Sequence, residues 1–354
     1  MSKISSYFIS LKVINALIKY DINKYSSFAP NKAFYKGLNG ERVPVKVINP
    51  EEESCKVFIL YPGASPFGEE HPKMLMLGHI LAKNGFNVYI PRIPPLKKLE
   101  VTHENIQWFA CFYSWLLNDE KVDSENIIMS GISYGGGLML RMLIDNYGKL
   151  PLPKSTLTFG TYADSKSLFH FFLNGQIEVD GKLYNIEPNE WGLIVIFHNF
   201  LKNLTLDWNS NNLQRALKEK INDFEDELHD YTKHLTEFEK DLFNSIISGR
   251  ANEHVKELTY LILENEEEAF RKLSPRYGSE KLTDKVFILH GANDSMVPFI
   301  QSIQLSNYLP NTNLCISYLY EHKEIASNKS FISMMYESYK LINFYAKLFS
   351  HYES

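Results

Sequence analysis

Cysteine is scarce in this sequence. The 354 residues include 3 cysteines, Cys55, Cys111 and Cys315, which lie far apart and are odd in number. This pattern argues against a disulfide framework, and no group of cysteines and histidines has the spacing of a zinc site. We therefore expect no bound metal and a reduced, cytoplasmic setting.

An excess of positive charge is also lacking. Lysine and arginine number 37 against 42 aspartates and glutamates, so the net charge is -5. A protein that binds nucleic acid usually carries a basic patch or stripe, and none is visible here. No nucleic-acid partner is expected.

Long hydrophobic runs are missing as well. The apolar stretch at residues 4–18 is interrupted by Lys12, is too short to span a membrane and has no cleavage signature behind it. We expect an amphipathic helix packed on the protein, within an N-terminal helical segment at residues 1–42. The alternative is an anchor on a membrane surface that uses apolar residues of this helix, namely Tyr7, Phe8, Leu11, Ile14 and Leu17.

Short apolar runs that alternate with helical patterns are abundant. Strands are predicted near residues 57–61, 86–90, 126–130, 155–159, 285–289 and 314–320. Helices are predicted near 71–83, 105–117 and 331–349, and a further helix follows the tight turn after 126–130 and ends at 144. This alternation predicts an α/β fold with a mainly parallel central sheet and helices on both faces. The core domain is expected at residues 43–163 and 276–354.

The alternation stops between residues 164 and 275, where a helical insertion is predicted. Apolar residues recur at steps of three or four from Leu213 to Leu242, which indicates one long helix, and a second helical stretch follows at 254–273. The stripe is expected to pack on neighbouring helices. Its alternative use is a seam between two copies in a homodimer.

One short motif carries chemistry. Gly131-Ile132-Ser133-Tyr134-Gly135 follows an apolar strand and precedes a helix pattern. A sharp strand-to-helix turn needs small flanking residues, and it exposes the serine side chain at a helix N-terminus. Ser133 is therefore the candidate nucleophile.

On these residues the sequence resembles the α/β-hydrolase superfamily, and three further stretches extend the likeness. His290-Gly-Ala-Asn-Asp294-Ser-Met-Val-Pro298 resembles the stretch that carries the family's triad acid, which implies Asp294 in that role and a structural role for His290. Asp164 is the rival acid. His322 follows the last strand and completes the order Ser, Asp, His, although Glu321 and Lys323 stand beside it where family members often have glycine.

The third stretch is Pro62-Gly63-Ala64. By resemblance it supplies the backbone N–H of Ala64 to an oxyanion hole, together with the N–H of Tyr134. The likeness also implies that a large insertion after the sixth strand forms a cap over the site.

The resemblance implies a serine hydrolase that cleaves small-molecule acyl esters through an acyl-enzyme, without an organic cofactor. A peptidase, a thioesterase and an acyltransferase use the same triad and remain alternatives. A peptidase acting on free N-termini needs an acidic pair in the insertion, for which residues 225–227 and 266–268 are the candidates. A binding protein without catalysis is the alternative from a different class.

Overall fold

The predicted parallel sheet is confirmed by a computed structural model, which describes residues 3–179, 181–222, 230–319 and 331–354. Its main sheet has eight strands in the order β1-β2-β4-β3-β5-β6-β9-β10. Strand β2 pairs antiparallel with β1 and with β4, and the remaining pairs are parallel. The strands are β1 (Asn31–Lys36), β2 (Arg42–Ile48), β3 (Val57–Tyr61), β4 (Asn87–Pro91), β5 (Ile127–Ile132), β6 (Ser155–Phe159), β9 (Val286–Gly291) and β10 (Thr312–Ser317).

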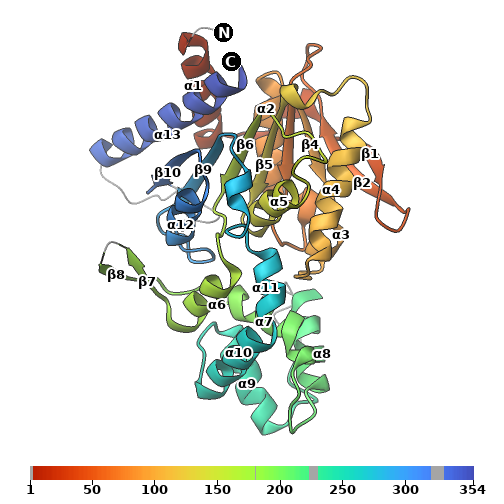
Figure 1. The fold of residues 1–354 in the computed structure, drawn as a ribbon, viewed down its shortest axis with the longest axis vertical. Coiled ribbons are helices and arrows are strands. Elements are labelled where there is room, and N and C mark those ends of the chain that lie inside the picture. The colour runs from red at the N-terminus through yellow and green to blue at the C-terminus, as the bar shows by residue number, and fades with distance from the viewer. Residues whose placement is uncertain (1–2, 180, 223–229, 320–330) are drawn as a thin grey trace.

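Helices cover both faces of this sheet (Figure 1). The side chains of strand β3 are buried alternately on the two faces of the sheet. Ile59 belongs to one hydrophobic core, and its neighbours Phe58 and Leu60 belong to the other. Such runs are buried on both sides, as parallel strands usually are. One core includes α4 (Glu104–Leu117), α5 (Tyr134–Asp145) and α12 (Ile300–Tyr308), and the other includes α1 (Lys3–Ile18), α2 (Pro72–Lys83) and α13 (Phe331–Tyr352).

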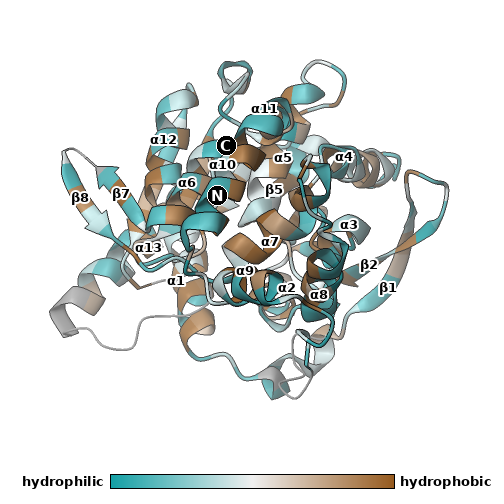
Figure 2. Ribbon diagram, turned by 90° about the horizontal axis from the view of Figure 1, so that it is seen from below, coloured by the Kyte–Doolittle hydropathy of each residue, from teal (hydrophilic) through white to brown (hydrophobic). Residues whose placement is uncertain are grey.

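The segment between β6 and β9 forms a mostly helical lobe below the ends of the parallel strands (Figure 1). Helix α7 is strongly apolar, and it lies in the centre of this lobe when the molecule is viewed from below (Figure 2). The lobe contains α6 (Ser165–Asn174), the hairpin β7 (Gln176–Val179) and β8 (Lys182–Asn185), α7 (Trp191–Phe200), α8 (Asn211–Asn222), α9 (Glu237–Ile247), α10 (Glu253–Asn265) and α11 (Glu267–Leu273).

Short elements complete the described chain. They are α3 (Pro94–Lys97) and the 3-10 helices η1 (Ile22–Phe28), η2 (Gly68–Glu70), η3 (Ser124–Asn126), η4 (Leu201–Asn203) and η5 (Ser279–Lys281).

Two expectations about the helical segments are wrong. The stripe from Leu213 to Leu242 does not lie on one helix, because residues 231–234 form a turn and Thr236 begins α9 with a capping box. Leu213, Leu217 and Leu242 are buried within the chain itself. The predicted helix at 254–273 is likewise interrupted at Glu266.

The N-terminal segment is not helical throughout. Residues 31–36 form the edge strand β1, so residues 1–42 do not form a separate helical unit. The alternation in Lys32-Ala-Phe-Tyr-Lys is too short to be distinguished from a loop before β2 is in place. Pairing with β2 therefore decides its structure.

Helix α1 packs against α13, with Val13 and Ile14 buried and Phe8 and Leu11 exposed. The hydroxyl of Tyr7 donates to Asn343 Oδ1 at 2.8 Å. None of the helices within the described ranges is long and apolar enough to cross a membrane.

Candidate active site

Ser133 occupies a strained turn between β5 and α5. Its φ of 53° and ψ of -130° lie outside the regions that L-residues favour. Among the described non-glycine residues, Leu99 alone shares a positive φ. Strain of this kind persists only where the surroundings hold it, and it is concentrated at functional sites.

The surroundings of Ser133 hold that conformation from both sides. Its N–H donates to the carbonyl of Phe159 at 2.7 Å, and its carbonyl accepts from Thr161 Oγ1 at 2.9 Å. A Cβ on Gly131 would lie 2.6 Å from Gly136 Cα, and one on Gly135 would lie 2.1 Å from the carbonyl oxygen of Pro62. The two glycines flanking the serine are therefore required by close backbone approach.

The loop after β3 lies against this turn. A Cβ on Gly63 would come within 3.2 Å of Ser133 Cβ, so Ala64 follows directly from the point of contact. Tyr134 is the first residue of α5, and its N–H has no partner within the helix. Both predicted oxyanion residues thus line the same cavity as Ser133.

An ion pair anchors the other end of this loop. Glu69 is fully buried and receives the Arg92 guanidinium at 2.6 Å, while Lys97 lies 3.9 Å away. Glu70 beside it pairs with Lys97, which lowers the pKa of that carboxyl through the hydrogen bond. The sequence gives no separate signal for this anchor, because its partners come from distant segments.

Asp294 lies in the loop after β9 with 1% of its surface exposed. Its Oδ1 accepts from the N–H groups of Met296 and Val297 at 2.9 and 2.8 Å, and both of those residues line the cavity. His290 Nε2 donates to the Val297 carbonyl at 2.7 Å, and its Nδ1 contacts Ser302 Oγ at 2.6 Å. His290 thereby fastens the loop that carries Asp294.

The rival acid, Asp164, is engaged elsewhere. Its carboxylate caps α6 through the N–H of Ser167 at 2.8 Å and pairs with Arg276 Nε at 2.7 Å. Asp164 and Arg276 stand at the two ends of the lobe, and their contact therefore ties those ends together.

His322 lies outside the described residues, so the geometry of the predicted triad is not defined at that position. Strand β10 ends at Ser317, whose carbonyl accepts from Ala292 N–H at 2.8 Å. The chain thus leaves β10 next to the loop that carries Asp294.

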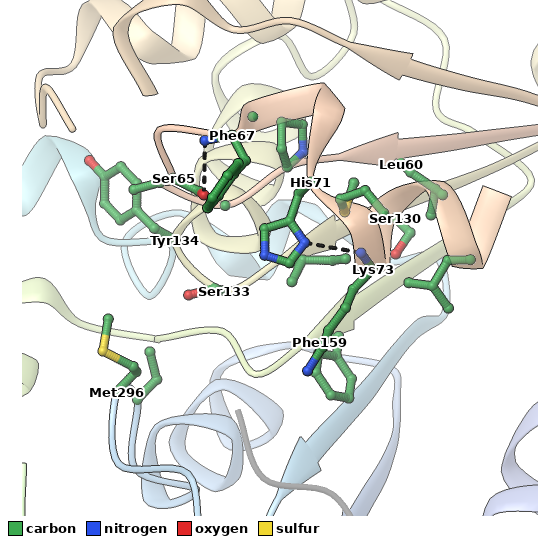
Figure 3. Close-up of a pocket in the computed structure, with 18 of the residues that line it drawn as sticks. Leu60, Ser65, Phe67, His71, Lys73, Ser130, Ser133, Tyr134, Phe159 and Met296 are labelled. Atoms are coloured by element: carbon green, nitrogen blue, oxygen red, sulfur yellow. Dashed lines mark hydrogen bonds between the residues drawn. The ribbon is translucent and has the colours of Figure 1, made fainter. Parts of the chain in front are cut away.

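A histidine that sequence reasoning missed lies in the cavity. His71 is the one histidine that lines it in the described part of the chain, and it lies near Ser133 (Figure 3). It caps α2, accepting from Lys73 N–H at 3.2 Å through Nδ1. The only hint in the sequence is Pro72, since proline favours the first position of a helix.

Ser133 opens into a cavity of about 730 Å³. That size is typical of small-molecule sites. The cavity extends in two directions from the serine: Tyr134 lies on one side, and Leu60, Ser130 and Phe159 lie on the other (Figure 3). We call the first part the insertion-side arm, lined by Tyr134, Leu168, Phe169, Phe172, Trp191 and Val195, and the second the sheet-side arm, lined by Leu60, Leu77, Leu157, Phe159, Leu289 and Phe349.

The lobe is held against the core beside the insertion-side arm. Asn199 of α7 accepts from the N–H of Val101 at 2.8 Å and donates to the carbonyl of Leu99 at 2.9 Å. Leu99 and Val101 both line the cavity. The strained Leu99 is thus fixed by a side chain from the lobe.

Comparison with known proteins identifies the fold. No family model matches the chain. No curated protein matches it either. Among solved structures, an acylaminoacyl peptidase from Pyrococcus horikoshii is 17% identical over 96% of this chain and 43% of that chain, with a TM-score of 0.52. A putative dipeptidyl aminopeptidase IV from Bacteroides ovatus is 11% identical over 92% and 36%, also with a TM-score of 0.52.

The chain spans less than half the length of these solved proteins. The likeness is one of fold. Together with the mainly parallel sheet and the mostly helical lobe after the sixth strand, it establishes that the chain has the α/β-hydrolase fold.

Proposed function

We propose that this protein is a serine hydrolase of carboxylic esters, with Ser133 as nucleophile, His322 as general base and Asp294 as the acid that orients it. The observation that carries the proposal is the strained conformation of Ser133 in a largely apolar cavity. A serine held in a strained backbone conformation, with Ala64 and Asp294 in the loops after β3 and β9, fits the nucleophile of this fold.

The chemistry follows from these positions. Ser133 Oγ attacks the ester carbonyl carbon while its proton passes to His322. The oxyanion accepts hydrogen bonds from the N–H groups of Ala64 and Tyr134. His322 then gives the proton to the departing alcohol, and water, deprotonated by the same histidine, releases the acid and restores Ser133.

The composition of the cavity wall favours esters over peptides with free N-termini. No aspartate or glutamate is among the described residues that line it. Glu267 and Glu268 are exposed and pair with Lys166, Arg271 and Lys272, and Glu266 accepts from Asn203. Residues 225–227 lie outside the described residues. A charged amine would therefore find no described carboxylate partner in the cavity.

We further propose that residues 164–275 act as a cap. Leu168, Phe172 and Trp191 of this segment contribute to the wall opposite the sheet. A wall of this kind excludes water from the acyl-enzyme and limits the shape of the alcohol that enters.

A fluorophosphonate probe tests the proposal, with intact mass and peptide mapping as readouts. We expect one adduct on Ser133 that disappears in Ser133→Ala and His322→Ala. Ser124→Ala, a serine on the same domain away from the cavity, serves as the control and should label normally. Folded protein that remains unlabelled would contradict the assignment of a working nucleophile.

A further inference from the structure

The sheet-side arm enters the second hydrophobic core. The insertion-side residues Leu168, Phe169 and Phe172 belong to the core that includes α4 and α5, whereas Leu60, Leu157 and Leu289 belong to the core under α1, α2 and α13. One cavity therefore connects the two faces of the sheet at the position of Ser133.

The sheet-side arm also runs deep. Its wall includes Phe58 and Leu60 of β3, and Leu157 and Phe159 of β6. Phe58 lies three residues before the end of β3 and Leu157 two residues before the end of β6, so the arm descends about 7–10 Å below the strand ends. Helices α2 and α13 close it from the other side through Leu77 and Phe349.

The chemistry of this wall is that of a hydrocarbon site. Among its described residues, the one charged side chain is Lys73, which is exposed and lies beside Phe159 at the opening (Figure 3). A polar group placed deeper would lose its hydration with few partners, whereas an alkyl chain would not.

The insertion-side arm is formed by a different part of the chain. Leu168, Phe169, Phe172, Trp191 and Val195 all come from the lobe between β6 and β9. The sheet and two core helices surround the sheet-side arm, whereas the lobe supplies most of the wall of the insertion-side arm.

From these two walls we infer the substrate class and its orientation. The substrate is an ester of a fatty acid, whose acyl chain enters the sheet-side arm between the sheet, α2 and α13. The alcohol portion lies in the insertion-side arm, against the side chains of the lobe. The inference rests on the proposed ester hydrolysis at Ser133.

The test compares two half-buried leucines of α2 that differ in one respect. Leu77 lines the cavity and Leu75 does not. We measure kcat/KM for p-nitrophenyl butanoate and dodecanoate in the wild type, Leu77→Trp and Leu75→Trp. Each buried methylene is worth roughly fourfold in kcat/KM, so a tryptophan that blocks the arm should lower the dodecanoate-to-butanoate ratio about tenfold or more.

Leu75→Trp should leave the ratio unchanged. Val195→Trp, which fills the other arm, should also preserve the ratio but alter the preference among alcohols. If Val195→Trp lowers the ratio and Leu77→Trp does not, the acyl chain enters the insertion-side arm and the inference is overturned. A wild-type preference for butanoate that neither variant changes overturns it as well.

Binding without turnover separates this inference from the proposed function. In Ser133→Ala, a fluorescent fatty acid should bind, dodecanoate should displace it and Leu77→Trp should weaken binding. If this binding is found and the wild type shows no esterase activity, the hydrocarbon site stands and the proposed hydrolase function is refuted. If the wild type hydrolyses esters and Ser133→Ala binds no fatty acid, the hydrolase function stands and the inferred fatty-acid site is refuted.

Discussion

Replacing Gly135 with alanine separates the fold from the proposed oxyanion hole. The new Cβ would lie 2.1 Å from the carbonyl oxygen of Pro62, while ordinary contact of carbon with oxygen needs about 3.3 Å. The loop from Pro62 to Ala64 must therefore move by about 1 Å. Alanine is itself the better helix former, by about 1 kcal/mol, so α5 should persist.

The expected consequence is catalytic. A displacement of this size typically lowers the rate about 100-fold, equivalent to about 2.7 kcal/mol of transition-state stabilisation. Because the Ala64 N–H acts on the oxyanion and not on the bound ester, kcat should fall much more than KM rises. Hydrolysis of p-nitrophenyl butanoate measures both constants.

Gly148→Ala is the control for a glycine-to-alanine change away from the cavity. Gly148 adopts a positive φ, which Gly135 does not, and a Cβ there meets nothing within 4 Å. It should lose about 1 kcal/mol of stability to backbone strain and keep its kcat. If Gly135→Ala retains its melting temperature and a kcat within about threefold of the wild type, the reasoning about the Pro62–Ala64 loop is refuted.

Three further outcomes are expected. His322→Ala should abolish ester hydrolysis while His71→Ala should change kcat less than tenfold; the reverse order in a kinetic comparison would make His71 the base. Glu69→Ala should lower the free energy of unfolding in urea by about 1–3 kcal/mol, because the partly exposed Arg92 loses its buried partner and retains only Glu70; an unchanged midpoint would refute the anchor. Burial lowers the pKa of His79, so below about pH 6.5 the unfolded chain binds a proton that the folded one does not. The melting temperature should therefore fall less steeply toward pH 5.5 in His79→Gln, and equal slopes would contradict this.

The local elements of the core were predictable because their signals are short-range. Strands β3 and β6 have the predicted bounds, α2 begins one residue later than predicted, and α5 ends one residue later than predicted. The glycines around Ser133 likewise indicate a sharp turn from the sequence alone, since glycine spacing records close backbone approach.

The errors arise where distant partners decide the outcome. A stripe with helical spacing from Leu213 to Leu242 is compatible with one long helix or with two helices that fold back on one another. The Thr236 capping box and burial against the rest of the lobe select the second arrangement. Strand β1 forms only because β2 offers an edge to pair with.

The sequence by itself determined the α/β alternation, the position of the insertion and the turn that carries Ser133, since each depends on neighbours within a few residues. The tertiary structure alone decided that Glu69 meets Arg92, that His71 lies near Ser133, and that the cavity continues beneath the sheet toward α2 and α13. These features depend on contacts between side chains from segments far apart in the chain, and the periodicity of apolar residues in the sequence does not predict such contacts.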